Sequence, residues 1–437
     1  MRAEDTIAAL SSGALPAGIA VLRVSGPAAR LAMESLAGGV PDPRRASLRT
    51  FRDRSGVPID RGLLLFFPGP GSVSGEDLAE FHVHGGRAVA AAMLAALTGI
   101  SGVRLAEAGE FTRRAFENGR IDLTEAEGLA DLLAAETEGQ RARAMAQAGG
   151  SLRQLADAWM ARLLRARALI EAAFDFSDEG DVADDVAGGV AAEVAALAGE
   201  MRRSLAEARR GEIWRDGFHV VIAGAPNAGK SSLLNALAER EVAIVSPVPG
   251  TTRDVIETRL DLGGVPVRFS DTAGLRAADD AVEAIGVERA RAALRQADLV
   301  LQLVAPGEEA GELEGEAPVL RLRTKRDLAP DGPPPAGFDL ALSARTGEGI
   351  DALVRRVADA AREAAGDPAR AVPARLRQRE VVAGTLAHLD AYDPLHQPAE
   401  VAAETLRLAA DRLGALTGRR GVEDLLGVIF GEFCIGK

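Results

Sequence analysis

The sequence predicts a multidomain protein with an α+β N-terminal domain, a helical domain in two halves, and an α/β domain inserted between those halves. A chain of 437 residues is longer than one hydrophobic core usually serves. The pattern of apolar and turn residues changes three times along the chain. It passes from short apolar runs with glycine turns to helical periodicity, then to alternating strands and helices, and back to helices. These changes predict four segments, at residues 1–118, 119–210, 211–370 and 371–437.

The first segment contains short apolar runs between glycine turns. IAVLRVSG (19–26), GLLLFF (62–67) and AEFHVHGG (79–86) predict strands, and RAVAAAMLAAL (87–97) predicts a helix. Together these elements predict a compact α+β domain.

The second segment has apolar residues at helical spacing. Its first helix is expected to begin with a capping box formed by Thr124 and Glu127. A second helix is expected over 151–174, and the acidic stretch 175–185 should interrupt the run. A third helix should follow and end near residue 209.

Composition limits the class of protein. Hydrophobic residues make up 47% and charged residues 26%, as in ordinary globular proteins. A net charge of −13 argues against broad, non-specific binding of nucleic acid, while the arginines between 141 and 167 suit either a local basic patch or a solvated helix face. The chain has no apolar run of about 18 residues and no signal peptide, which predicts that it does not span a membrane. A single cysteine fits a reducing compartment, so we expect a cytoplasmic protein.

The third segment opens with the apolar run FHVVIAG (218–224), which predicts a buried strand. GAPNAGKS (224–231) follows it, matches G-x-x-x-x-G-K-[ST], and leads into a predicted helix. Glycines let successive backbone N–H groups point at phosphate oxygens, and the helix N-terminus adds positive potential. Lys230 would neutralise charge on the β- and γ-phosphates, and the Ser231 hydroxyl would ligate Mg²⁺. These flanking elements disfavour the alternative of a chance glycine turn.

Three later motifs favour guanine over adenine. In the DTAG motif, Asp271 can hold Mg²⁺ through water and the Gly274 amide can meet the γ-phosphate. In the TKRD motif, the carboxylate of Asp327 can accept hydrogen bonds from guanine N1–H and N2–H₂, which adenine lacks, so an ATPase is disfavoured. Thr324 stands where the corresponding motif usually has asparagine. The SAR motif (343–345) follows another predicted strand, as expected for a backbone contact to the guanine oxygen.

The hydrolytic step should differ from that of many small GTPases. Leu275 follows DTAG and cannot orient a water molecule as a glutamine would. Asn227 and the segment 246–254 can supply side-chain and backbone oxygens for a large monovalent cation. Thr251 and Thr252 lie where a switch threonine would close over Mg²⁺.

At this point the sequence resembles a known family, the tRNA-modifying GTPases called MnmE or TrmE. The resemblance spans nearly the whole chain. Beyond the nucleotide motifs it is carried by these stretches: DTIAAL, VLRVSG, SGEDLAEFHVHGG, GEFTRRAFENGRIDLTEAEGLADLL, PGTTRD and the terminal FCIGK. The N-terminal stretches and the Cys-x-Gly-Lys tail are more specific than the nucleotide motifs, which many proteins share.

The resemblance implies a potassium-dependent GTPase that is activated when its G domains dimerise. The matching potassium ligands are Asn227, Ser246, Val248 and Thr251, and the matching Mg²⁺ ligands are Ser231 and Thr252. Glu283 matches the glutamate that positions water, so the implied catalytic residues are Glu283, Lys230 and Cys434. The positions implied to bind GTP are Asn227, Ala228, Gly229, Lys230, Ser231, Ser232, Ser246, Gly250, Thr251, Thr252, Asp271, Thr272, Ala273, Gly274, Thr324, Lys325, Asp327, Ser343, Ala344 and Arg345.

The resemblance also implies a folate site and several partners. Arg23, Glu80, Arg120 and Lys437 match contacts to 5,10-methylenetetrahydrofolate, for which 5-formyltetrahydrofolate is an analogue. The family dimerises through the N-terminal domain and acts with the flavoprotein MnmG, which implies a homodimer within a heterotetramer. Together they add a carboxymethylaminomethyl or aminomethyl group to C5 of the wobble uridine of certain tRNAs.

The one thiol, Cys434, lies in the tail. If Lys437 contacts folate, a Cys434 thiolate could act on a one-carbon or uridine intermediate; the alternative is a small apolar side chain that packs near Phe433 and Ile435. His82 and His84 share one strand face, but too few further ligands accompany them to predict a zinc site.

A competing function is a regulatory GTPase of ribosome assembly that binds rRNA without modification chemistry. The nucleotide motifs would be the same in both proteins. Folate binding by the N-terminal domain would favour the modification enzyme.

Overall fold

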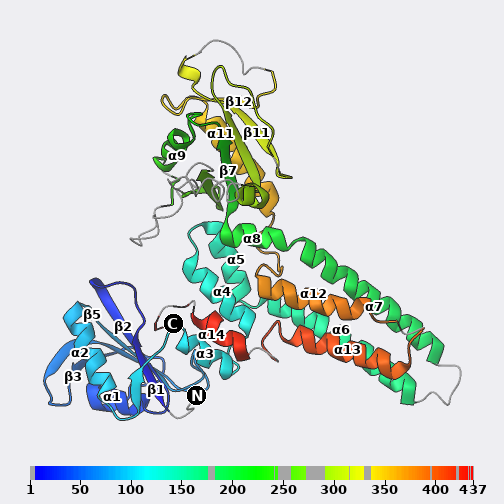
Figure 1. Cartoon of the computed structure of the whole chain (residues 1–437). Helices are drawn as coiled ribbons and strands as arrows, with labels where there is room; N and C mark the ends of the chain where they lie inside the picture. The colour runs from blue at the N-terminus through cyan, green and yellow to red at the C-terminus, as the bar shows by residue number, and fades with distance from the viewer. Residues whose placement is uncertain are drawn as a thin grey trace, which may run out of the picture. The chain divides into compact units, whose positions relative to one another are not determined.

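The computed structural model describes residues 5–175, 183–240, 242–244, 257–271, 291–313, 315–328, 336–393, 396–419, 423–431, 433 and 435–436 (Figure 1). The chain forms two compact units. Unit 1 comprises Met1–Ala130 and Ala410–Lys437, and unit 2 comprises Asp131–Ala409.

Unit 1 is built on a six-stranded sheet with the strand order β3-β4-β5-β2-β1-β6. All neighbouring strands are antiparallel except β1 and β6. The strands are β1 (Thr6–Leu10), β2 (Ala17–Ser25), β3 (Ser47–Arg52), β4 (Pro58–Phe67), β5 (Leu78–Gly85) and β6 (Val103–Leu105). The predicted strands over 19–26, 62–67 and 79–86 are therefore confirmed as parts of β2, β4 and β5.

Two helices, α1 (Ala29–Ala37) and α2 (Arg87–Thr98), contribute to the core of this sheet. Strand alternation directs Leu22 and Val24 of β2 into that core. Arg23, between them, lies on the opposite face of the sheet. The helix predicted over 87–97 is confirmed as α2.

The remaining helices of unit 1 join distant parts of the sequence. The helices are α3 (Glu110–Glu117), the first part of α4 (Leu123–Ala134) and α14 (Glu423–Gly431). Leu123 of α4 and Phe430 of α14 share one core cluster. The N-cap of α3 is Gly109, whose φ is 66°, and a Cβ there would lie 2.2 Å from the carbonyl oxygen of Phe430. Glycine therefore permits this close packing.

The start of α4 corrects the predicted capping box. The Glu125 amide donates to Asp122 Oδ1, and the Asp122 amide donates to Glu125 Oε2. Thr124 lies inside the helix, where its hydroxyl also donates to Asp122 Oδ1. The box predicted for Thr124 and Glu127 is wrong, because aspartate caps helices as well as threonine and lies two residues earlier.

The first helix expected in the second segment ends near the start of unit 2. A new helix, α5 (Glu138–Ala148), starts after Thr137, whose side chain accepts from the Gln140 amide while the Gln140 side chain accepts from the Thr137 amide. This capping box stops α4 from running into α5. Sequence periodicity alone missed the break, since apolar spacing continues on both sides.

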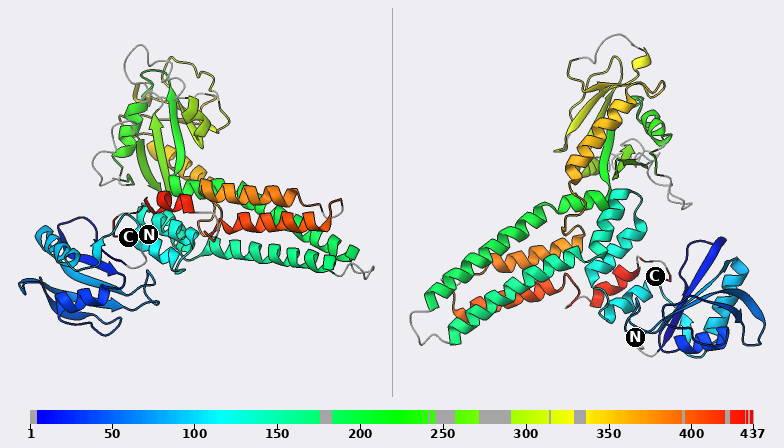
Figure 2. Two further views of the ribbon diagram at one scale, coloured as in Figure 1. Left: turned by 60° about the horizontal axis from the view of Figure 1, so that its bottom comes forward. Right: turned by 180° about the vertical axis from the view of Figure 1, so that it is seen from behind.

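Long helices make up much of the helical part of unit 2, and Figures 1 and 2 show α6, α7 and α12 side by side. The helices are α6 (Ser151–Asp175), α7 (Ala183–Ala206), α8 (Ala208–Asp216), α12 (Leu376–Asp390) and α13 (Ala399–Gly414), whose last residues belong to unit 1. Trp159 of α6 is buried and its indole N–H donates to Glu200 of α7 at 2.9 Å. The predicted helix over 151–174 is confirmed as α6, whereas the helix expected to end near 209 is divided into α7 and α8.

The α/β part of unit 2 has a six-stranded sheet with the order β12-β11-β10-β7-β9-β8. The elements are β7 (Phe218–Gly224), α9 (Lys230–Ala238), β8 (Glu257–Leu262), β9 (Val265–Asp271), β10 (Leu299–Val304), β11 (Val319–Arg323), a short 3₁₀ helix (Arg326–Leu328), β12 (Leu340–Ala341) and α11 (Ile350–Ala365). The alternation of strands and helices gives five parallel strands, as expected of an α/β domain, whereas the edge strand β8 pairs antiparallel with β9. The two-residue turn Gly263–Gly264 joins these strands, and so short a turn can only form a hairpin.

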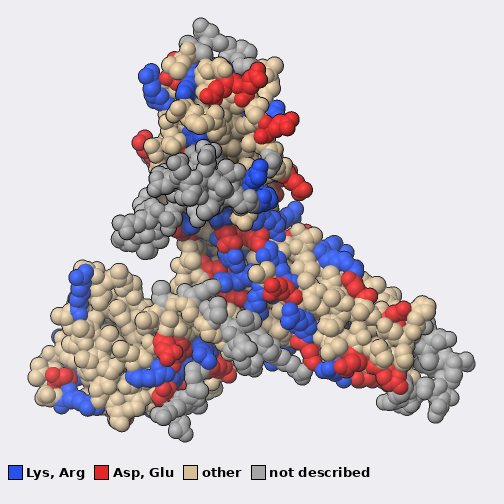
Figure 3. Space-filling view, viewed as in Figure 1, with Lys and Arg blue, Asp and Glu red and all other residues tan. Residues whose placement is uncertain are grey.

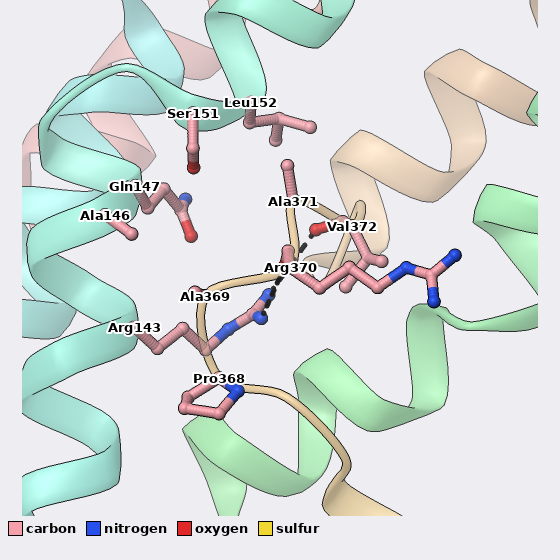
Figure 4. Close-up of a pocket in the computed structure, with 10 residues that line it drawn as sticks. All are labelled: Arg143, Ala146, Gln147, Ser151, Leu152, Pro368, Ala369, Arg370, Ala371 and Val372. Atoms are coloured by element: carbon pink, nitrogen blue, oxygen red, sulfur yellow. Dashed lines mark hydrogen bonds between the residues drawn. The ribbon is translucent and has the colours of Figure 1, made fainter.

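Contacts of α5 and its N-cap help to join the helical and α/β parts of unit 2. The Thr137 hydroxyl donates to the Gly264 carbonyl at 2.7 Å, which ties α5 to the β8–β9 turn. The guanidinium of Arg143 donates to the carbonyl oxygens of Arg370 and Val372 in the segment that leaves α11 (Figure 4). Burial lowers the pKa of Arg143. Helix α5 and its N-cap therefore contact the α/β part at the β8–β9 turn and at the segment that follows α11.

Charges of both signs are mixed on the surface. Figure 3 shows lysine and arginine side chains interspersed with aspartate and glutamate over the face in view. In the part of the chain that the structure describes, no helix combines the length and the apolar character needed to cross a membrane.

Candidate functional site

The loop GAPNAGKS joins a buried strand to a helix. It begins at Gly224, the last residue of β7, and α9 starts at Lys230. Asn227 and Gly229 have φ values of 67° and 100°, a left-handed conformation that asparagine and glycine tolerate best. The first N–H groups of a helix lack partners within it, so this loop can present those of α9 to an anion.

Lys230 and Ser231 occupy the first turn of α9. The Lys230 amine donates to the carbonyl oxygens of Gly224 and Ala225, each at 2.9 Å, which holds its charge over the loop. Ser231 Oγ lies 3.5 Å from Oδ2 of Asp271, the last residue of β9. A hydroxyl and a carboxylate oxygen are ligand types that Mg²⁺ prefers, so this pair fits the predicted metal.

The predicted base-recognition residues follow β11 and β12. The Ser343 hydroxyl donates to Asp327 Oδ1 at 2.7 Å, and Arg345 Nε lies 3.2 Å from Asp327 Oδ2. The bond from Ser343, followed by the charges of Arg345 and Lys325, lowers the pKa of Asp327. The carboxylate is therefore ionised and can accept hydrogen bonds near neutral pH.

These groups collect at one edge of the sheet. The strands β7, β9, β10, β11 and β12 run parallel. Lys230, Asp271, Asp327 and Ser343 lie at or after the carboxyl ends of β7, β9, β11 and β12, respectively. Ligands of open α/β sheets bind at the carboxyl ends of such strands. The structure thus brings together the described members of the predicted nucleotide site, including Ala228 and Ser232, and Ala344 between Ser343 and Arg345.

Several predicted site residues lie outside the described part of the chain. They are Ser246, Val248, Gly250, Thr251, Thr252, Thr272, Ala273, Gly274, Glu283, Cys434 and Lys437. Their predicted roles stay predictions.

A second group of predicted residues lies in unit 1, on neighbouring strands. Arg23 of β2 is directly opposite Glu80 of β5, and Arg23 Nη2 donates to Glu80 Oε1 at 2.7 Å. The other oxygen, Oε2, lies 3.3 Å from Nε2 of His82. Glu80 therefore presents an oriented carboxylate on the sheet face opposite the α1–α2 core. Its chemistry suits the amino-pyrimidine edge of a pterin, because a carboxylate can accept two parallel hydrogen bonds.

The chain's tail docks beside these strands. The Ser11 hydroxyl donates to the Gly436 carbonyl at 2.8 Å, and Ile435 forms an antiparallel bridge with Ala108. Ser11 follows β1 directly, and Ala9 of β1 is paired with Arg23. Arg120, the third predicted folate residue, donates from Nε to the Ser72 carbonyl at 3.1 Å. The contact between the tail and β1 thus lies next to the strand that carries Arg23.

Comparison with known proteins gives matches over the whole chain. Residues 6–120 match the family described as GTP-binding protein TrmE N-terminus, and residues 123–434 match the MnmE helical domain. The tRNA modification GTPase MnmE of Brucella anthropi is 51% identical over 99% of this chain and 98% of its own length. The same-named protein of Mesorhizobium japonicum is 53% identical over 100% of both chains. This chain belongs to the MnmE family of tRNA modification GTPases.

Another relative of the same name agrees with this membership. The MnmE protein of Rhizobium johnstonii is 52% identical over 99% of each chain. Among solved structures, the G domain of the T. maritima FeoB iron transporter is 27% identical and covers 33% of this chain and 98% of that chain, with a TM-score of 0.26. As a member of the MnmE family, the chain is a GTP hydrolase, and the resemblance stated from sequence is confirmed.

Sequence reasoning missed contacts that hold this MnmE chain's two sites. The SAR motif was expected only to make a backbone contact, yet the Ser343 hydroxyl also orients Asp327. Ser11 was not predicted at all, because a serine just after a strand carries no signal for a partner more than 400 residues away. Gly436 did carry a signal, because a glycine marks a position where the backbone can adopt a positive φ. Its φ of 94° and the close Leu10 carbonyl oxygen explain why the tail needs glycine there.

Proposed function

We propose that GTP hydrolysis by this chain requires Mg²⁺ and K⁺ and serves modification of the tRNA wobble uridine. Ser231, Thr252 and, through water, Asp271 would hold Mg²⁺. Asn227, Ser246, Val248 and Thr251 would hold K⁺, whose charge would replace an arginine finger. The oxygen pair of Ser231 and Asp271 supports the Mg²⁺ assignment. Asn227 supports the K⁺ assignment because it lies in the loop itself and carries a side-chain carbonyl oxygen.

We further propose that GTP is bound by the twenty positions that the family resemblance implies. Lys230 supplies positive charge at the phosphates, and Glu283 orients the attacking water. Asp327 recognises guanine N1–H and N2–H₂, which its lowered pKa supports by keeping the carboxylate ionised.

The docked tail is the observation that carries the second half of the proposal. Ile435 and Gly436 contact the N-terminal part of unit 1 next to the strand of Arg23. We propose that Arg23, Glu80, Arg120 and Lys437 bind 5,10-methylenetetrahydrofolate, which would supply the one-carbon unit. Cys434, two residues from Gly436, is then within the same tail and would take part in the modification chemistry.

The partners follow from the same proposal. The chain would form a homodimer in the cytoplasm, bind the flavoprotein MnmG in a heterotetramer, and add the carboxymethylaminomethyl or aminomethyl group to C5 of the wobble uridine. The proposed domains are 1–118 for folate binding and dimerisation, 119–210 and 371–437 for the helical domain, and 211–370 for the GTPase.

Mass spectrometry of wobble uridines in cells that lack this protein tests the proposal. The C5 modification should disappear and return when the gene is restored. If the modification persisted and the purified protein bound rRNA tightly but no folate, the regulatory GTPase would be the better assignment.

The cation requirement is tested separately with purified protein. GTP turnover with Mg²⁺ should rise steeply when K⁺ replaces Na⁺, because the smaller ion fits the oxygen cage poorly. Equal rates in the two salts would remove the K⁺ site from the proposal.

A further inference from the structure

Thr324 links the base-recognition loop to the phosphate loop. Its hydroxyl Oγ1 lies 2.8 Å from the carbonyl oxygen of Ala228, in the loop GAPNAGKS. The side chain is only 3% exposed, and the carbonyl of Val304, at 3.4 Å, is its other neighbour. Both neighbours are acceptors, so the hydroxyl must act as the donor in this contact.

The number of protons at this position has a consequence for base recognition. A threonine hydroxyl carries one proton, and the Ala228 carbonyl takes it. An asparagine amide carries two, so it could hold the same carbonyl and still donate to a ring nitrogen of a base. N7 of guanine is an acceptor, and the lone pairs of a hydroxyl cannot serve it. Thr324 therefore has no donor left for N7.

We propose that Thr324 is a positioning residue that ties the base loop to the phosphate loop, and that this enzyme binds guanine without a hydrogen bond to N7 from this position. The inference rests on the proposed guanine site. It assigns base selectivity to the other edge of the ring, where Asp327 is oriented by Ser343. Position 324 then contributes affinity by joining two loops, and contributes nothing to selectivity.

The first test compares GDP with 7-deaza-GDP, in which N7 is replaced by C–H. The wild-type protein should bind the two within about twofold of each other. Thr324→Asn should gain a preference for GDP of about five- to tenfold, the usual effect of one hydrogen bond. A wild-type preference of tenfold or more for GDP, or no change of preference in Thr324→Asn, would overturn the inference.

The second test measures how fast fluorescent GDP dissociates from hydroxyl variants. Thr324→Val keeps the shape but leaves the Ala228 carbonyl without its donor, and should speed dissociation of GDP and 7-deaza-GDP equally, by about five- to tenfold. Thr324→Ser keeps the hydroxyl and should restore the wild-type rate to within about twofold. Unequal effects on the two nucleotides, or no rescue by serine, would contradict a positioning role.

A matched control is available in the same unit. Thr385 of α12 is fully buried and its hydroxyl donates to the Val381 carbonyl at 2.9 Å. Thr385→Val loses the same kind of bond away from the nucleotide loops and should leave dissociation unchanged. If it matched Thr324→Val, the effect would reflect general loosening and the inference would fall.

Failure of the underlying site would look different. Inosine diphosphate, which lacks the N2 amino group, and ADP should both bind the wild-type protein more weakly than GDP. Equal binding of GDP, inosine diphosphate and ADP would refute the proposed guanine site itself, whatever the result with 7-deaza-GDP.

Discussion

The phosphate loop and the tail site are assembled in opposite ways. All residues from Gly224 to Ser231 come from one stretch of chain, from the end of β7 to the first turn of α9. The tail site consists of the docked tail and the predicted folate residues on β2 and β5, beside β1. Its hydrogen bond from Ser11 to Gly436 joins residues that are 425 positions apart in the sequence. A local motif keeps its geometry wherever the strand and helix form, whereas a dispersed site depends on the packing of a whole unit.

This difference predicts that the two sites can be damaged independently. Changes in the nucleotide domain should act on GTP hydrolysis first and on tRNA modification through it. Changes at the tail should spare hydrolysis. The following variants test that separation, from the largest expected effect to the smallest.

Cys434→Ser should abolish wobble-uridine modification and leave GTP hydrolysis intact, because serine removes the thiolate but keeps the side-chain size. Modification is measured by mass spectrometry of tRNA from cells that carry only the variant, and hydrolysis with purified protein. Fully modified tRNA would make the thiol merely structural.

Glu283→Ala should leave GTP binding intact and reduce hydrolysis by at least ~10²-fold, as expected for loss of a group that orients water. Single-turnover hydrolysis and fluorescent nucleotide binding measure the two effects. Unchanged turnover would remove Glu283 from this role.

Gly436→Ala should detach the tail. Its φ of 94° is unfavourable for alanine, by about 1–2 kcal/mol, and the new Cβ would lie 2.1 Å from the Leu10 carbonyl oxygen. We expect modification to fall about tenfold while hydrolysis stays within twofold. Gly427→Ala is the control, since a Cβ there meets nothing within 4 Å. Equal modification by the two variants would show that tail docking is not required.

Glu110→Gln tests whether unit 1 can be weakened alone. Glu110 is 4% exposed and its carboxylate accepts from Arg104 and Arg114. Burial raises the pKa of Glu110, but the bonds from Arg104, the Glu107 amide and Arg114 outweigh it, so the pKa lies below its ordinary value of 4.5. Because the pKa is lowered in the folded state, the ionised Glu110 carboxylate stabilises the fold at pH values above 4.5. This stabilisation is lost as the pH falls through the pKa of the folded state.

At pH 7 this substitution should destabilise unit 1 by about 2 kcal/mol, because Arg104 and Arg114 lose a buried carboxylate acceptor. The loss is only partial, since Asp5 and Glu76 still pair with these arginines. The difference in the free energy of unfolding between the wild-type protein and this variant should become smaller below about pH 4. Hydrogen exchange of β1 amides reports unit 1, whereas fluorescence of Trp159 and Trp214 reports unit 2, which should not change. Glu138→Gln, at an exposed ion pair with Arg141, is the control and should have little effect. If the difference in the free energy of unfolding did not change with pH, the role of the Glu110 charge would be refuted.

Much of the fold could be predicted because its signals are local. The strand over 218–224 and the helix over 151–174 have periodicities that their neighbours do not contradict. The errors arose where two local signals competed. Asp122 outcompeted Thr124 as the cap of α4, and Thr137 divided a helix whose apolar spacing was continuous. The alternation of strands and helices in this segment hid the hairpin of β8 and β9. These strands pair antiparallel because only the two-residue turn Gly263–Gly264 joins them.

The sequence by itself determined the nucleotide loop, the guanine motifs and the family, because each is carried by short motifs whose own residues lie within a few positions of one another. Only the tertiary structure decided that Thr324 donates to the phosphate loop, that Ser343 orients Asp327, and that the tail docks against β1. Hydrogen bonds and close backbone contacts depend on distances in space, and a linear sequence does not show which distant groups the packing of the core brings within about 3 Å.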